Sequence, residues 1–84
     1  MSSLLAKEWT EDGTLHMDVR GIPAPGPLVA ILRRVRELAR GERLIVHHDR
    51  DPKLLYAELN EMGWEALPQS APAGEVRLLL REIP

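Results

Sequence analysis

Cysteine is absent from this chain of 84 residues, and phenylalanine is absent as well. Without a thiol, the chain can form no disulfide, no thiolate metal ligand and no cysteine nucleophile. The absence of cysteine also fits a reducing compartment. Aromatic residues are scarce, with two tryptophans and one tyrosine, so the usual stacking residues of single-stranded RNA binding are largely missing.

An excess of positive charge and long apolar runs are also missing. The net charge of -2 argues against general nucleic-acid binding, which depends on lysine and arginine to neutralise phosphates. The apolar runs are too short to cross a bilayer, and the N-terminal MSSLLAKEW lacks the basic start and apolar stretch of a signal peptide. We therefore expect a soluble cytoplasmic protein of one domain, with no nucleic-acid or membrane partner.

The first half of the chain predicts a strand, a helix and a second strand. Residues 15–19, LHMDV, alternate apolar and polar side chains as a half-buried strand does. The stretch GIPAPGP, residues 21–27, ends that strand because proline lacks an N–H and restricts the residue before it. Pro27 then starts a helix that Gly41 is expected to end. Residues 44–46 form an apolar run typical of a parallel strand that is covered on both faces. The helical stripe consists of Leu28, Ile31, Leu32, Val35, Leu38 and Ala39.

The second half predicts another helix and two more strands. Asp51 is the expected N-cap and Pro52 the first residue of a helix that Gly63 closes. Residues 64–69 and 75–83 indicate two strands joined by the turn SAPAG. The order β-α-β-α-β-β predicts a two-layer α+β sandwich, with two helices on one face of a four-stranded mixed sheet.

An Asp-Gly pair at positions 12 and 13 is a hairpin signal, so residues 4–9 are a candidate extra edge strand. We accordingly assign residues 1–14 to an N-terminal segment and residues 15–84 to a single domain.

The segment DVRGIPAPGP resembles the signature of the TusA/SirA-like sulfur carriers. That signature is a strand, Asp-x-Arg-Gly, two further residues, and Cys-Pro-x-Pro at the start of the first helix. The resemblance covers residues 15–83 and includes the order of the elements. The rest of the chain is similar to an uncharacterised branch of that superfamily, whose domains of unknown function are sometimes joined to hemerythrin-like domains. The matching signature residues are Asp18, Arg20, Gly21, Pro25 and Pro27.

This resemblance places the carrier cysteine at Ala24. In the carriers, a thiolate beside a helix N-terminus is stabilised by unpaired N–H groups and the helix dipole, and can therefore hold transferable sulfur. Ala24 keeps the backbone and removes the sulfur, and no other cysteine can substitute for it. We therefore predict that the chain does not transfer sulfur.

His47, His48 and Asp49 are candidate metal ligands or acid–base groups. Adjacent strand residues point to opposite faces, so the two histidines cannot chelate one ion while the strand continues. His16 is expected to lie too far back along its strand to join them. No serine or cysteine nucleophile stands in a recognisable motif, so we expect neither a metal site nor an enzyme.

Ligands of open α/β sheets bind beyond the carboxyl ends of the parallel strands. Here that position brings the loops RGIPAPGP and HHDRDP side by side. We predict a non-catalytic TusA-like domain that binds a protein partner or a small anion there, with no cofactor and with Arg20 contacting the anion. The alternative is a metal- or haem-linked accessory protein that uses His47 or His48. The predicted binding residues are Arg20, Ala24, Pro25, His48 and Asp49.

Apolar residues on both faces of two strands predict a further surface. Residues 44–46 and 78–80 must each place at least one apolar side chain on the sheet face without helices. The N-terminal segment with Leu4, Leu5 and Trp9 is one candidate cover for that face. A protein partner or a second copy of the chain, giving a homodimer, is the other.

Overall fold

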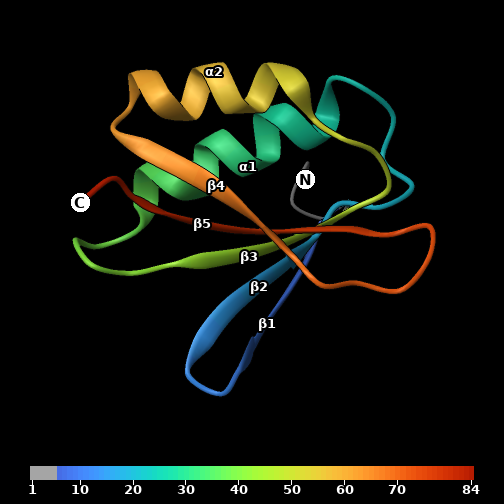
Figure 1. Ribbon diagram of the computed structural model, residues 1–84, viewed down its shortest axis with the longest axis horizontal. Helices are drawn as coiled ribbons and strands as arrows, with labels where there is room; N and C mark the ends of the chain where they lie inside the picture. Colours follow the sequence, from blue (N-terminus) through green and yellow to red (C-terminus); the bar gives the residue numbers. More distant parts are fainter. Residues whose placement is uncertain (1–5) are drawn as a thin grey trace.

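Five strands and two helices form residues 6–84, the part of the chain that the computed structural model describes (Figure 1). Leu4 and Leu5, the candidate cover of the sheet, lie outside the described residues. In chain order the elements are β1 Lys7–Glu11, β2 Thr14–Asp18, α1 Gly26–Glu37, β3 Leu44–His48, α2 Lys53–Glu61, β4 Trp64–Gln69 and β5 Val76–Glu82.

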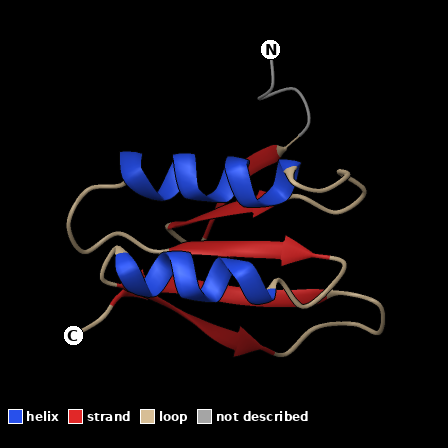
Figure 2. Ribbon diagram, turned by 90° about the horizontal axis from the view of Figure 1, so that it is seen from above, coloured by secondary structure: helices blue, strands red, loops and turns tan. Residues whose placement is uncertain are grey.

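The strands form one mixed sheet in the order β1-β2-β3-β5-β4. Strands β2 and β3 are parallel, whereas β1–β2, β3–β5 and β4–β5 are antiparallel. Both helices lie on the same side of the sheet (Figures 1 and 2). This arrangement confirms the predicted two-layer α+β sandwich and its additional N-terminal edge strand. No helix within residues 6–84 is long and apolar enough to cross a membrane.

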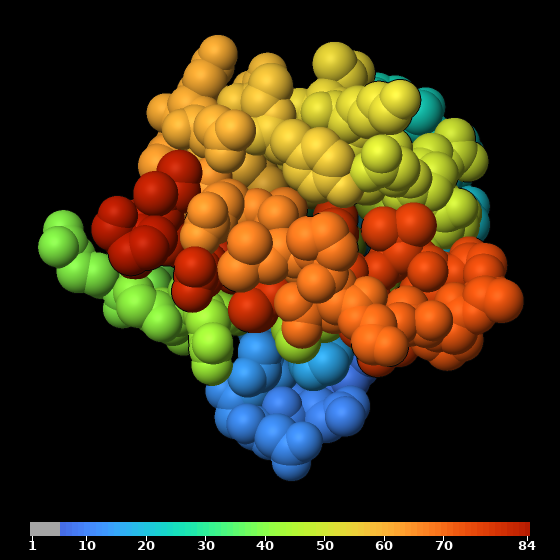
Figure 3. All heavy atoms as spheres, in the orientation of Figure 1, coloured from blue at the N-terminus to red at the C-terminus, as the bar shows by residue number. Residues whose placement is uncertain are grey.

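The edge strand β1 is joined to β2 by the predicted tight turn. Asp12 and Gly13 both have positive φ, at 53° and 80°, as a two-residue hairpin loop of type I′ requires. The strand runs from Lys7 to Glu11, and the predicted start at residue 4 lies outside the described residues. The resulting hairpin projects from one end of the molecule (Figure 3).

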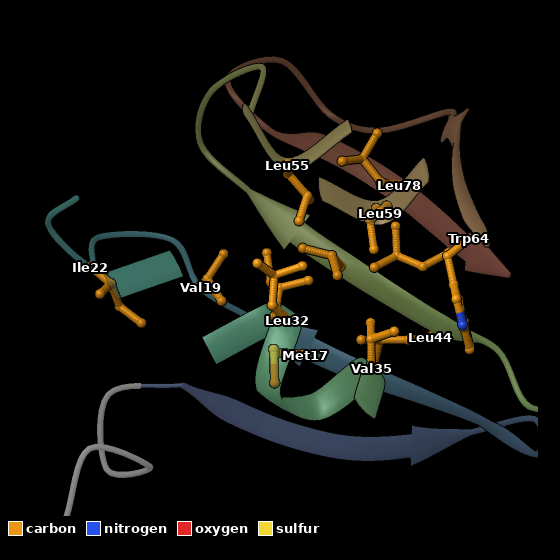
Figure 4. Close-up of a cluster of buried hydrophobic side chains, with 13 residues drawn as sticks. Met17, Val19, Ile22, Leu32, Val35, Leu44, Leu55, Leu59, Trp64 and Leu78 are labelled. Atoms are coloured by element: carbon orange, nitrogen blue, oxygen red, sulfur yellow. The ribbon is translucent and has the colours of Figure 1, made fainter. Parts of the chain in front are cut away.

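The core lies between the helices and the covered face of the sheet (Figure 4). Alternation places one set of strand residues on this face, and apolar residues of both helices pack against them. Of the predicted α1 stripe, Ala39 lies beyond the helix and is exposed. Apolar burial of this kind supplies most of the stabilisation of a small domain. The strand residues are Met17, Leu44, Val46, Leu78 and Leu80, and the helix residues are Ile31, Leu32, Val35, Leu55 and Leu59.

Both helices are shorter than predicted. Helix α1 ends at Glu37, because Leu38 is extended and the next amide, Ala39 N–H, bonds to the side chain of Glu42 at 2.6 Å. Gly41 has the expected positive φ, but it lies in the turn beyond the helix and does not cap it.

Asp51 is not the N-cap of α2, and this part of the prediction was wrong. Pro52 holds the N-cap position with no side-chain cap, and the helix begins at Lys53. The Asp51 carboxylate instead accepts a hydrogen bond from the Tyr56 hydroxyl, and its backbone carbonyl accepts one from Lys53. The carboxylate is thus engaged with a side chain of the helix and not with the free N–H groups of its first turn.

Candidate binding cleft

A cleft of about 310 Å³ lies where the loop after β2 approaches the loop after β3. This is the position beyond the carboxyl ends of the parallel strands at which a ligand site was predicted. Three of the predicted site residues, Ala24, Pro25 and His48, line it. Most of its wall is apolar and is formed by Ile22, Pro27, Leu28, Ile31, Leu54 and Leu55.

The loop GIPAPGP is shaped by short backbone hydrogen bonds and by one close approach. The amide of Ile22 bonds to the Val19 carbonyl at 3.3 Å, and that of Gly26 bonds to the Pro23 carbonyl at 2.9 Å. A Cβ on Gly26 would lie 2.6 Å from Cγ2 of Ile22, so the first residue of α1 must be glycine for Ile22 to pack beneath it. The loop therefore presents Ala24 and Pro25 to the cleft in a fixed position.

His48 is the buried polar residue of this cleft, with 3% of its surface exposed. Its Nδ1 accepts a hydrogen bond from the Asp49 amide at 2.9 Å. The neutral ring therefore carries its hydrogen on Nε2 and can donate it to a ligand. Burial is the main cause that lowers the pKa of His48, which favours this neutral form.

Asp49 and Arg20 do not line the cleft but hold the loops on either side of it. Asp49 Oδ2 accepts the Gly21 amide at 2.9 Å, and this bond lowers the pKa of the Asp49 carboxyl. Arg20 donates to both oxygens of Asp18, at 2.9 and 2.8 Å, and to Glu75 at 3.2 Å. The Asp18 carboxylate raises the pKa of Arg20, and Arg20 in turn lowers the pKa of Asp18 to about 2. Arg20 is thus paired with carboxylates of its own chain, and its anion-binding role stays a prediction.

The rim of the cleft carries two cations, Arg50 and Lys53. The Arg50 side chain is 68% exposed and lies 3.3 Å from the Asp49 carboxylate. Asp51 is the acidic residue of the rim, and its carboxylate is engaged by Tyr56. Burial, together with this bond, raises the pKa of Tyr56 to about 12.

A second group of polar residues lies on the sheet face without helices, and the sequence reasoning missed it. His47 and His48 point to opposite faces, as predicted, but the expectation that His16 lies far from His47 was wrong. The register places His16 opposite Ile45 and Asp18 opposite His47, so the two histidines are diagonal neighbours on the same face. His16 Nδ1 and His47 Nε2 are 2.9 Å apart. Alternation along the two strands could have placed both histidines on one face, but their proximity also depends on the register between the strands.

Within residues 6–84, no three histidine, aspartate or glutamate side chains are grouped so that they could hold a metal ion. His47 hydrogen-bonds to His16 and Glu75, and His48 faces the cleft. The alternative of a metal or haem site on either histidine stays a prediction.

The fold and the cleft together define a small two-layer α+β domain with an apolar site at the carboxyl ends of its parallel strands. Residues 16–82 match the family model described as "Uncharacterized conserved protein (DUF2249)". The match covers most of the chain, and the chain belongs to this family. No curated protein matches the chain.

Proposed function

We propose that the chain is a non-catalytic TusA-like binding domain that accepts an apolar segment of a protein partner in the cleft between its GIPAPGP and HHDRDP loops. The observation that carries this proposal is the exposure of Leu54 beside an apolar cleft. Leu54 is 75% exposed although it lines the cleft with buried Leu55 and Ile22. A large apolar side chain at the edge of an apolar hollow is typical of a protein-binding site.

The polar groups of the cleft indicate what kind of segment would fit. The rim carries two cations, Arg50 and Lys53, and one carboxylate, Asp51, which is already bonded to Tyr56; this balance favours acidic residues in the partner. His48 offers one donor, Nε2–H, within the apolar wall, which suits a backbone carbonyl or a carboxylate. A peptide with an apolar side chain flanked by acidic residues would match the apolar wall, the rim cations and the His48 donor together.

Ala24 supports binding without sulfur transfer. It lines the cleft just before α1, the position that the resemblance gives to the carrier cysteine. A methyl group there adds to the apolar wall and offers no nucleophile. On this proposal the domain keeps the partner-binding geometry of a carrier and lacks its chemistry.

A displayed library of random peptides tests the proposal with the chain as bait. We expect enrichment of peptides with an apolar residue flanked by Asp or Glu, and loss of their binding to Leu54→Lys. Ile83→Lys is the matched control, because Ile83 is also exposed, at 47%, but does not line the cleft. NMR shifts on peptide addition should concentrate at Ile22, His48 and Leu54.

Three results would contradict the proposal. Peptides that bind wild type and Leu54→Lys equally, or no enrichment at all, would exclude the cleft as a peptide site. Shifts of the same resonances with sulfate alone, without peptide binding, would favour the small-anion alternative. Metal analysis of the purified protein tests the metal- or haem-linked alternative, which requires a stoichiometric metal or haem.

A further inference from the structure

The sheet face opposite the cleft contains a buried pair of hydrogen-bonded histidines. His16 is 8% exposed and His47 is 6% exposed, and their nitrogens Nδ1 and Nε2 are 2.9 Å apart. His47 Nδ1 lies 2.8 Å from Oε2 of Glu75. The Trp9 ring lies against both imidazoles, with centroids 5.3 Å from His16 and 5.1 Å from His47. The indole of the edge strand β1 therefore covers the histidine pair.

The hydrogen-bond geometry determines how many protons this pair can accept. The Glu75 carboxylate is an acceptor, so His47 carries a hydrogen on Nδ1. When both rings are neutral, His47 Nε2 is an acceptor and His16 Nδ1 donates to it. When one proton is added, His47 Nε2 becomes the donor and His16 Nδ1 the acceptor, so the 2.9 Å contact survives.

A second added proton removes the hydrogen bond between the two rings. With both rings protonated, every ring nitrogen carries a hydrogen, and two N–H groups would face each other across the contact. Two positive charges would also lie side by side beneath Trp9, at a site shielded from water. The pair can therefore bind one proton without rearrangement, but a second proton must separate the rings.

One carboxylate, Glu75, bonds directly to the pair and can balance the charge of a single imidazolium. Glu75 accepts from His47 and also binds Arg77 at 2.8 Å, and Arg77 is the main cause that lowers the pKa of Glu75. A single imidazolium is balanced by this ionised carboxylate, whereas a second meets the nearby arginines. The charged groups facing the pair from the neighbouring elements are Lys7 and Glu11 on β1, Asp18 on β2, Arg20 after it, and Glu75 and Arg77 at β5.

We propose that the His16–His47 pair is a pH-operated latch that holds the Trp9 side chain of strand β1 against the open face of the sheet. The latch stays closed with no or one added proton and opens when both imidazoles are protonated. Opening displaces Trp9, because the indole packs against both rings. It thereby uncovers the two imidazoles, on the sheet face that also carries Ile45 and Leu79. Protonation of the two imidazoles is therefore the event that operates the latch.

NMR of the whole chain from about pH 8 to about pH 4 tests the latch, since this range spans histidine titration. Nitrogen shifts of the imidazoles count the protons. The ring C–H signals of Trp9 and Trp64 report packing, because the Trp9 indole N–H also donates to Glu11 at 3.3 Å. We expect the pair to titrate in two steps, with the Trp9 signal unchanged in the first and moved towards its solvent-exposed position in the second. The buried Trp64 should not respond. A single common step, or a Trp9 signal unchanged with both rings protonated, would overturn the proposal.

His16→Gln provides a matched variant without the latch. The glutamine amide can accept from His47 Nε2–H or donate to Nε2, so it tolerates either state of His47. We expect Trp9 to stay packed through the pH range in which wild type releases it. Release at the same pH in His16→Gln would also refute the latch. If this variant does not fold, as far-ultraviolet circular dichroism would show, the two-step titration of wild type still decides.

Discussion

The amide of Gly21 donates a hydrogen bond to Oδ2 of Asp49, at 2.9 Å, beyond the carboxyl ends of the parallel strands β2 and β3. This bond joins the loop after β2 to the loop after β3, which are the two loops that flank the cleft. Gly21 can adopt its φ of 82° without strain, and its amide then faces the carboxylate. Asp49, which lies outside the cleft, therefore helps to hold its two flanking loops together.

Replacement of Asp49 by Ala should loosen the two loops and lower the free energy of unfolding at neutral pH. The bond from Gly21 lowers the pKa of Asp49, so its stabilisation is present above the ordinary pKa of the carboxyl. It is lost as the pH falls through the lowered value in the folded chain. Urea titrations at several pH values should show wild type and variant converging in acid. A stability gap that does not narrow in acid would show that the carboxylate charge is not responsible.

Replacement of Asp18 by Asn should destabilise the chain near neutral pH and have no effect in strong acid. Arg20 lowers the pKa of Asp18 from 3.8 to about 2, so the stabilisation is lost as the pH falls between these values. The side chain is 18% exposed, and after allowance for solvent screening we expect a cost of about 1 kcal/mol. Asp12→Asn, in the exposed hairpin turn, is the control and should cost little. Equal costs for both variants would contradict the role of the Arg20 pair.

Replacement of Gly26 by Ala should destabilise the chain by about 1–3 kcal/mol, because a new Cβ overpacks against a buried neighbour. That Cβ would lie 2.6 Å from Cγ2 of Ile22, a stiff branched side chain. In an Ile22→Ala background the same change should cost much less, since the obstructing methyl group is gone. Chemical denaturation of the four proteins measures this coupling. Additive effects would mean that the loop moves aside.

Replacement of Leu59 by Ala should cost about 2–5 kcal/mol, the range for deleting buried methyl groups. Leu59 is fully buried between α2 and the sheet, at 0% exposure, whereas Leu54 on the same helix is 75% exposed. Leu54→Ala should therefore change the stability by less than about 0.5 kcal/mol. Equal losses at both positions would place the wrong face of α2 against the core.

Wild type should acquire no covalent sulfur when it is incubated with a cysteine desulfurase and cysteine. The chain has no cysteine, and Ala24 occupies the position that the resemblance to the sulfur carriers gives to their thiol. Intact mass spectrometry measures any adduct. Ala24→Cys should gain a fraction of loading, because its thiol would stand in the loop before α1. A stable sulfur adduct on wild type would contradict the proposed loss of sulfur transfer.

Local patterns in the sequence predicted most of the fold. Alternation identified β2, the apolar runs identified β3 and β5, and helical spacing identified the buried residues Ile31, Leu32 and Val35 of α1. The ends of the helices were less predictable. The Glu42 side chain accepts the Ala39 amide, which the prediction had left inside α1, and Tyr56 bonds to the Asp51 carboxylate, which the prediction had used as the N-cap of α2. Such competition depends on tertiary contacts that no local window of sequence contains.

The candidate site was predictable in position but not in detail. The topology of parallel strands placed Ala24, Pro25 and His48 together. Arg20 does not line the cleft because its guanidinium binds two carboxylates, Asp18 and Glu75. Glu75 is 55 residues distant in the chain, so local sequence could not reveal this pairing. The His16–His47 pair was missed because it depends on the register between β2 and β3, which a single sequence leaves undefined.

Strand β5 lies between β3 and β4, although it follows both of them in the chain. During synthesis on the ribosome, β4 therefore has no neighbouring strand to pair with until β5 has emerged. The N-terminal hairpin and the β2-α1-β3 unit can assemble earlier, since their partners are already present. The sheet is thus completed by insertion of its last strand, and a chain arrested before residue 76 would expose the inner edges of β3 and β4.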